Sequence, residues 1–202
     1  PAADEWGWLR ELYTPLGPLL LGSHPAGNMA LAGAVADAAE GGWALSGPCG
    51  MGEREIEMAR ANPHAHILCI QAQWNHLLET RRRALGAKIA NLYFARGSAI
   101  LLPLQDESVE AVWTANGFHL YTAPELAMTQ IARVTKPGGL VAGVSLAAGG
   151  PRYVDALLDL SGRRFPGRRD AFKHFRLLAA SGLRDLRAYR DGAYVRFTSV
   201  RE

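Results

Sequence analysis

Short apolar runs alternate along the chain with segments in which apolar residues recur at helical spacing. The apolar runs lie at residues 43–47, 66–71, 90–95, 109–115 and 140–146. Strands form nearly continuous apolar runs when helices cover both faces of a parallel sheet. The pattern therefore predicts an α/β fold, Rossmann-like and doubly wound, with a mostly parallel sheet and helices on both faces.

The predicted helices begin and end at recognisable residues. Acidic side chains crowd residues 53–57 directly after Gly52, where they favour the positive end of a helix dipole. A further helix begins at Pro124, which a first turn tolerates, and the Lys-Pro-Gly-Gly run at 136–139 is expected to stop it before the next strand. A helix is also expected over residues 170–180, between a capping Asp and a Gly.

The last part of the chain has the pattern of a β-hairpin. Residues 186–190 and 193–200 flank Asp191-Gly192, a pair that favours a two-residue turn between antiparallel strands. We therefore expect the mostly parallel sheet to end in an antiparallel hairpin.

Composition limits the classes of protein to which the chain belongs. Its 202 residues, 49% hydrophobic and 20% charged, supply one sizeable core. No apolar run approaches the roughly 18 residues of a membrane helix, and no segment after Pro1 has the order of a signal peptide. Cys49 and Cys69 give no disulfide framework, and strand alternation would put Cys69 on the face opposite His64 and His66. We expect a cytoplasmic location, no membrane contact and no metal site.

Charge is distributed unevenly along the chain. Residues 1–150 carry 10 basic and 13 acidic side chains and residues 151–202 carry 12 and 6, so the net charge of +3 divides into −3 and +6. The basic final quarter would suit an anionic substrate, a nucleic acid or the acidic face of a protein partner. Four of its arginines stand among Gly and Pro, as in a solvated loop: Arg163, Arg164, Arg168 and Arg169. We expect no nucleic-acid binding and keep a protein partner as an alternative.

A glycine-rich turn between the first predicted strand and its helix carries the densest functional signal. It reads Leu-Ser-Gly-Pro-Cys-Gly-Met-Gly-Glu over residues 45–53. In an open parallel sheet, ligands bind beyond the carboxyl ends of the strands, and glycines let a ligand approach the backbone closely. The turn lacks the Lys of a phosphate-binding loop, and Glu55 stands where a dinucleotide turn needs a third small residue. ATP and a nicotinamide dinucleotide are therefore disfavoured as ligands.

Two further motifs link the chain to a known family. Residues 131–139 read Ile-Ala-Arg-Val-Thr-Lys-Pro-Gly-Gly, and residues 102–112 contain Leu-Pro-Leu before the fourth predicted strand. They resemble the Arg-Val-Leu-Lys-Pro-Gly-Gly junction and the Leu-Pro-Phe stretch of class I S-adenosylmethionine-dependent methyltransferases, especially the small-molecule branch that includes ubiquinone-type enzymes. The resemblance spans residues 43–146 most closely, and it implies S-adenosylmethionine as the cofactor.

The chain departs from that family where the family binds its cofactor. By resemblance, the contacts would come from Ser46, Gly47, Cys49, Gly50, Gly52, Gln71, Ala72, Ser98, Ala99 and Asn116. Neutral Ser46, Gln71 and Ser98 stand where the family has carboxylates, of which the second binds the ribose and the third faces the adenine. Pro48 replaces a glycine. Each exchange of a charged hydrogen-bond acceptor for a neutral one is expected to weaken cofactor binding by roughly three- to fiftyfold.

Residues 114–121, after the fourth predicted strand, hold the candidate catalytic residues. The resemblance implies that this segment lines the acceptor pocket, where His119 would accept a proton and Tyr121 would orient the acceptor. Packing of His119 beside Phe118 is the alternative role. Much of the rate enhancement of methyl transfer comes from holding donor and acceptor in near-attack geometry.

The sequence favours one function and leaves two alternatives open. We predict an S-adenosylmethionine-dependent methyltransferase that acts on a small molecule. The first alternative is a methyltransferase-like domain without catalysis that serves as a binding or assembly partner, and the second is a related fold that binds another nucleoside or small molecule. We expect one domain over residues 1–202, with a helical lid at 1–42, a nucleoside-binding core at 43–146, and a helix and hairpin at 147–202. The lid is expected to contain two helices, at residues 6–13 and 28–39.

Overall fold

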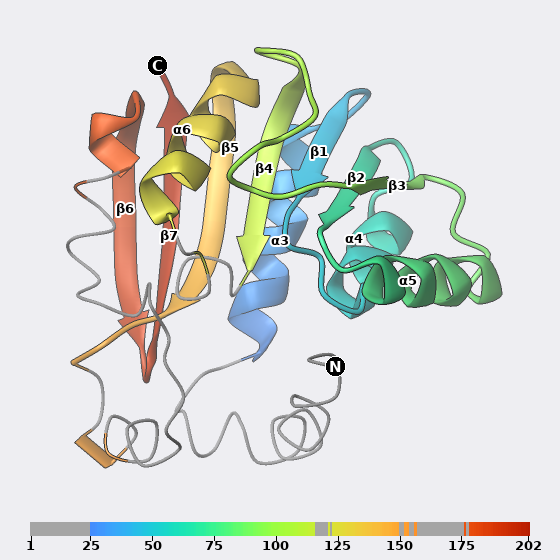
Figure 1. Ribbon diagram of the computed structural model, residues 1–202, viewed down its shortest axis with the longest axis horizontal. Coiled ribbons are helices and arrows are strands. Elements are labelled where there is room, and N and C mark those ends of the chain that lie inside the picture. The colour runs from blue at the N-terminus through green and yellow to red at the C-terminus, as the bar shows by residue number, and fades with distance from the viewer. Residues whose placement is uncertain are drawn as a thin grey trace.

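A computed structural model describes residues 25–115, 121, 123–149, 152–153, 156, 176 and 178–202 of the chain. It contains a 7-stranded sheet in the order β3-β2-β1-β4-β5-β7-β6 (Figure 1). The parallel strands are β1 (Trp43–Ser46), β2 (His66–Gln71), β3 (Leu92–Arg96), β4 (Val109–Ala115) and β5 (Thr135–Leu146). The antiparallel hairpin consists of β6 (Leu183–Asp191) and β7 (Tyr194–Arg201). The predicted fold class is confirmed.

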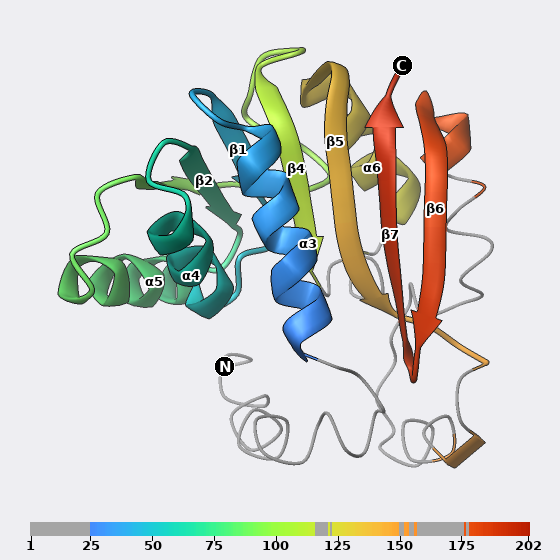
Figure 2. The ribbon, with the colours of Figure 1, turned by 180° about the vertical axis from the view of Figure 1, so that it is seen from behind.

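Helices cover both faces of this sheet (Figures 1 and 2). The helices are α3 (Pro25–Ala38), α4 (Glu53–Ala61), α5 (Trp74–Gly86) and α6 (Pro124–Val134). Val35, Met58 and Leu77 place α3, α4 and α5 in one buried apolar cluster, whereas Met128 and Ile131 place α6 in a second one. Successive side chains of a strand point to opposite faces, so β1, β2, β4, β5 and β7 contribute buried residues to both clusters. Within the described part of the chain, no helix is long and apolar enough to cross a membrane.

Helix α3 forms part of the core. It spans all but the last residue of the segment 28–39, which the sequence predicted as helical and assigned to a lid. Ala32 and Val35 are fully buried, and the helix packs against β4 and β5 (Figure 2). The buried Arg196 of β7 donates from Nε to Oδ1 of Asn28 at 2.7 Å, which ties the helix to the sheet. Helix α3 therefore covers one face of the sheet.

Two predicted elements fall outside the residues that the structure describes. They are the N-terminal helix at residues 6–13 and most of the helix at residues 170–180, of which 178–180 are helical. The arginine-containing loop at residues 163–169 also lies outside.

The junction between α6 and β5 differs from the prediction. The helix ends at Val134 and β5 begins at the next residue, so the Lys-Pro-Gly-Gly run at 136–139 lies within the strand. Gly139 approaches β4 so closely that a Cβ atom there would lie 2.6 Å from the carbonyl oxygen of Glu110. Gly138 has a φ of +78°, a conformation that favours glycine. The glycines therefore serve the pairing of β5 with β4 as well as the exit from the helix.

The hairpin turn lies one residue later than predicted. Asp191 pairs with Tyr194, which leaves Gly192 and Ala193 as the two turn residues. Gly192 has a φ of +60°, whereas Ala193 does not have a positive φ, and a type II′ turn requires this combination. Asp191 belongs to the strand because it can pair there with the buried cation of Arg196 at 2.5 Å.

Candidate functional site

A cavity of about 590 Å³ lies beyond the carboxyl ends of β3, β2, β1 and β4. This is the point at which the strand order reverses, where open α/β sheets bind their ligands. The volume is in the range of small-molecule sites. Nine of the residues predicted from the sequence line it: Gly47, Cys49, Gly50, Gly52, Gln71, Ala72, Ser98, Ala99 and Tyr121. Ser46 is not among the lining residues, and Asn116 and His119 lie outside the described part of the chain.

The glycine turn after β1 leaves space for a ligand. Gly50 has a φ of +55°, and an added Cβ atom would meet no atom within 4 Å. Gly52 has a φ of +75°, but a Cβ atom there would lie 2.0 Å from Cγ2 of Thr80. Pro48 lies in the cavity wall, and the cavity remains open beside it. One glycine therefore allows close ligand approach, and the other allows α4 to pack against α5.

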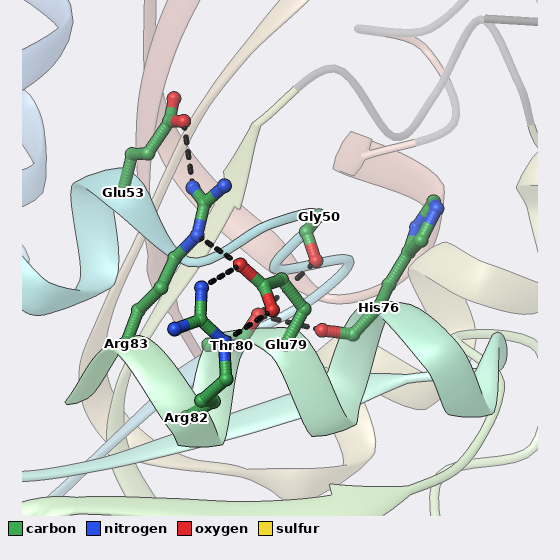
Figure 3. A network of polar contacts seen from close by, with 7 residues as sticks. All are labelled: Gly50, Glu53, His76, Glu79, Thr80, Arg82 and Arg83. Atoms are coloured by element: carbon green, nitrogen blue, oxygen red, sulfur yellow. Dashed lines mark hydrogen bonds and ion pairs between the residues drawn. The ribbon is translucent and has the colours of Figure 1, made fainter. Parts of the chain in front are cut away.

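Thr80 of α5 supports this turn from below (Figure 3). Its hydroxyl donates to the carbonyl oxygen of His76 at 2.9 Å and lies 3.4 Å from the carbonyl oxygen of Gly50. Thr80 is completely buried, so its position is fixed by packing. Contact with α5 consequently fixes the position of the turn's backbone.

An ion-pair network on the outer side joins α4 to α5 (Figure 3). Arg83 donates from Nε to Glu79 at 2.7 Å and from Nη1 to Glu53 at 2.9 Å. Hydrogen bonds from Arg82 and then from Arg83 lower the pKa of Glu79 to about 2. Because this pKa is lowered by folding, the stabilising contribution is present at neutral pH and is lost as the pH falls toward that value.

Gln71 is oriented by the turn that follows β2. Its Oε1 accepts a hydrogen bond from the backbone N–H of Ala72 at 2.9 Å and lies 3.5 Å from the backbone nitrogen of Gln73. The side chain lines the cavity. Because the turn occupies the amide oxygen, the NH₂ group is the part of Gln71 that can donate to a ligand oxygen.

Arg133 of the Arg-Val-Thr-Lys-Pro-Gly-Gly motif anchors the loop at residues 97–108. It donates from Nη1 to the carbonyl oxygen of Leu104 at 2.8 Å and from Nη2 to that of Leu102 at 3.0 Å. It also pairs with Asp106 at 2.6 Å. The same loop supplies the cavity-lining Ser98. Arg133 therefore holds the loop that forms part of the cavity wall, although Arg133 itself does not line the cavity.

Ser46 and Glu55 form a buried pair beneath the glycine turn. The Ser46 hydroxyl donates to Oε1 of Glu55 at 2.7 Å, and the two residues are 1% and 2% exposed. Burial raises the pKa of Glu55, although the hydrogen bond from Ser46 opposes this shift. Because folding raises this pKa, the contribution of Glu55 to stability decreases as the pH rises from its ordinary pKa to the raised one. Glu55 also lines the cavity, so it is a candidate binding residue.

Sequence reasoning did not place Glu55 in the site. The available signal was an acid three residues after Gly52, at a position where a dinucleotide turn has a small residue. In the sequence, this acid served only to disfavour a nicotinamide dinucleotide as the ligand. The pairing with Ser46, nine residues earlier, became visible only when β1 and α4 were placed together.

Tyr121 lies against the glycine turn. Its hydroxyl donates to the carbonyl oxygen of Gly47 at 3.2 Å. Burial raises the pKa of Tyr121, so the phenol remains protonated at neutral pH and can act as a donor. The predicted orienting role of Tyr121 is compatible with this position, whereas proton acceptance by its phenolate is not.

The two cysteines are buried thiols at the base of the turn. They form no disulfide. Burial, followed by contact with Cys49, raises the pKa of Cys69 well above its ordinary value, so this thiol is protonated. Among the described residues, no three His, Cys, Asp or Glu side chains gather in a way that could hold a metal ion.

Comparison with known proteins relates this geometry to a family. Residues 45–139 match the family model described as a methyltransferase domain. A fatty-acid O-methyltransferase of Mycolicibacterium smegmatis is 33% identical over 100 residues, which cover 50% of this chain and 35% of that protein. A demethylmenaquinone methyltransferase of Halalkalibacterium halodurans is 30% identical over 105 residues, which cover 50% of this chain and 42% of that protein. The chain therefore matches less than half the length of these relatives.

A solved structure shares the fold over the whole chain. The structure of the [4+2]-cyclase SpnF has a TM-score of 0.73 and covers 100% of this chain and 97% of its own, at 19% identity. At that identity the likeness establishes the fold and leaves the reaction open.

Proposed function

We propose that this chain, whose residues 45–139 match the model of a methyltransferase domain, is a class I S-adenosylmethionine-dependent methyltransferase that acts on a small molecule. The cavity over the carboxyl ends of β3, β2, β1 and β4 is the observation that carries the proposal. Ser98, Gln71 and the glycine turn line it in the order of their strands. In the resembling family this is the order in which the adenine, the ribose and the amino-acid end of the cofactor meet the protein.

The residues present suit this cofactor despite the missing carboxylates. The open space at Gly50 admits a ligand close to the backbone. The NH₂ group of Gln71 can donate to a ribose oxygen, and the hydroxyl of Ser98 can accept a hydrogen bond from an adenine amino group. When bound, S-adenosylmethionine would supply an electrophilic methyl group.

The chain's own contribution to the reaction is mainly positional. Loop 97–108, the glycine turn and Tyr121 all contribute to the cavity wall and would hold the ligand in position. Tyr121, whose hydroxyl proton goes to Gly47, would orient the O–H or N–H group of an acceptor by accepting a hydrogen bond at its hydroxyl oxygen. We keep His119 as the proposed proton acceptor and Asn116 as a proposed contact to the cofactor.

We propose an apolar small molecule as the methyl acceptor. Aliphatic side chains of Leu102, Val112 and Ile131 line the side of the cavity toward α6. Two matched relatives are named for a fatty acid and for demethylmenaquinone, both of which are largely apolar. A free fatty acid and a demethylated quinone are therefore the first acceptors to assay.

We also propose a cytoplasmic location.

A second candidate function is ligand binding without methyl transfer. Neutral Ser46, Gln71 and Ser98 favour it because charged acceptors at those positions would bind hydroxyl and amino groups more strongly. A fold neighbour named as a [4+2]-cyclase also shows that this fold does not dictate the reaction. Loss of catalysis would be compatible with an assembly role for a protein partner.

Calorimetric titration with S-adenosylmethionine and S-adenosylhomocysteine tests the cofactor. We expect micromolar dissociation constants, and we expect Gln71→Ala to weaken both about tenfold because a ribose hydrogen bond is lost. Asn75→Ala, at an exposed residue of α5 outside the cavity, is the matched control and should bind as the wild type does. Absent or millimolar binding of both ligands by the wild type would refute the methyltransferase proposal.

A further inference from the structure

The buried carboxylate of Glu55 is the feature that the proposed function leaves unexplained. It lies in the wall of the cavity, on the first turn of α4, and is 2% exposed. The hydrogen bond from Ser46, itself neutral, orients the carboxylate without compensating its charge. The neighbouring Arg54 attracts the carboxylate, but burial outweighs this attraction and raises the pKa of Glu55, so a cationic group held in the cavity would complete the site.

The position of Glu55 within the sheet order indicates which part of a ligand it would meet. Its partner Ser46 ends β1, which lies between β2 and β4. Ser98 follows β3, at the other side of the same cavity. With the adenine at Ser98 and the ribose at Gln71, the remaining end of S-adenosylmethionine reaches β1 and the glycine turn. That end carries an ammonium group, which has the charge that complements Glu55.

We propose that Glu55 binds the α-ammonium group of the cofactor, so that a carboxylate from α4 takes over the role that the neutral strand end at Ser46 cannot fill. The proposal rests on the proposed function and deepens it. Ser46 is a positioning residue in this arrangement, because its hydroxyl holds Oε1 of Glu55 at 2.7 Å. The acid is therefore on the helix, at Glu55, whereas the strand end that carries an acid in the resembling family carries the hydroxyl of Ser46.

This arrangement explains why a simple restoration of the family motif should fail. Ser46→Asp would place a second carboxylate within hydrogen-bonding distance of buried Glu55. Two carboxylates at such a distance repel each other unless one is protonated. The single substitution is therefore expected to weaken S-adenosylhomocysteine binding and to lower the melting temperature of the free protein.

Glu55→Gln tests the proposal when two ligands are compared. S-Adenosylhomocysteine carries the ammonium group, and 5′-methylthioadenosine lacks the amino-acid end. We expect Glu55→Gln to weaken the former about 10- to 100-fold and the latter less than twofold. The free variant should melt at the wild-type temperature or above, since an unfavourable buried charge is removed. Glu57→Gln, at an exposed carboxylate of the same helix outside the cavity, is the matched control and should bind both ligands normally.

A charge-relocation variant gives an independent answer if Glu55→Gln folds poorly. Ser46→Asp combined with Glu55→Ser returns the carboxylate to the strand, and it should bind S-adenosylhomocysteine at least tenfold more tightly than Glu55→Ser alone. Equal S-adenosylhomocysteine affinity in wild type and Glu55→Gln, with normal 5′-methylthioadenosine binding, would overturn the role of Glu55 and leave the proposed function intact. Failure of the wild type to bind either ligand would overturn both.

Discussion

Gly52→Ala is expected to lower the free energy of unfolding by about 3 kcal/mol and to abolish measurable S-adenosylhomocysteine binding. Gly52 has a φ of +75°, which a residue with a Cβ atom adopts only at a cost. The new Cβ atom would also lie 2.0 Å from Cγ2 of Thr80, a side chain that is completely buried. Relief of this clash requires α4 and α5 to separate, which distorts the turn. Urea unfolding followed by circular dichroism and calorimetric titration would measure the two effects.

Gly50→Ala is the matched control for that substitution. Gly50 has a φ of +55°, but no atom lies within 4 Å of the added Cβ atom. We expect a cost of only about 1 kcal/mol in stability together with a clear loss of ligand affinity, because the methyl group enters the cavity. Adding Thr80→Ser to Gly52→Ala removes Cγ2 and should recover part of the stability. A Gly52→Ala protein with wild-type stability and affinity would show that the turn is not built as described.

Arg133→Ala is expected to cost about 3 kcal/mol in stability and to weaken S-adenosylhomocysteine binding about tenfold. The substitution removes the donors from the carbonyl oxygens of Leu102 and Leu104, which Arg133 holds at 3.0 and 2.8 Å. Hydrogen bonds to a charged group contribute about 1.5–3 kcal/mol each, and part of this loss is offset by water. Loop 97–108 carries the cavity-lining Ser98, which we propose to face the adenine, so release of the loop should affect binding as well as stability.

Two controls separate the effect of the two hydrogen bonds that the Arg133 guanidinium donates to the loop from the effect of its positive charge. Arg133→Lys keeps the charge but cannot reach both carbonyl oxygens with the geometry of a guanidinium, so an intermediate loss is expected. Asp106→Asn removes only an exposed partner of the ion pair and should cost less than about 1 kcal/mol. If Asp106→Asn were as damaging as Arg133→Ala, the surface ion pair and not the loop carbonyls would be responsible.

The parallel strands were predictable because a strand that is buried on both faces forms a nearly continuous apolar run in the sequence. Strands β2 and β4 begin and end at the predicted residues, and the apolar run of each is nearly continuous. Boundaries that depend on pairing were less accurate. Gly139 belongs to β5 because its backbone approaches Glu110 of β4, and Asp191 belongs to β6 because it lies opposite Tyr194. Neither contact is visible in local sequence.

The candidate site was predictable in its location but not in its polar contacts. The glycine turn, Gln71 and Ser98 line one cavity, as strand-end positions in a parallel sheet should. The orientation of Gln71 could not be foreseen because it depends on the backbone N–H of Ala72. Glu55 was overlooked because its partner belongs to a different element, and short-range patterns do not report such pairs.

A crystal structure of the protein with S-adenosylhomocysteine would test the central claim most directly. We expect electron density for the adenine beside Ser98, for the ribose at Gln71 and for the amino-acid end over the glycine turn, with its ammonium group facing Glu55. Density at another face of the sheet, or a cavity that stays empty at saturating ligand, would contradict the claim that these strand ends form a nucleoside site.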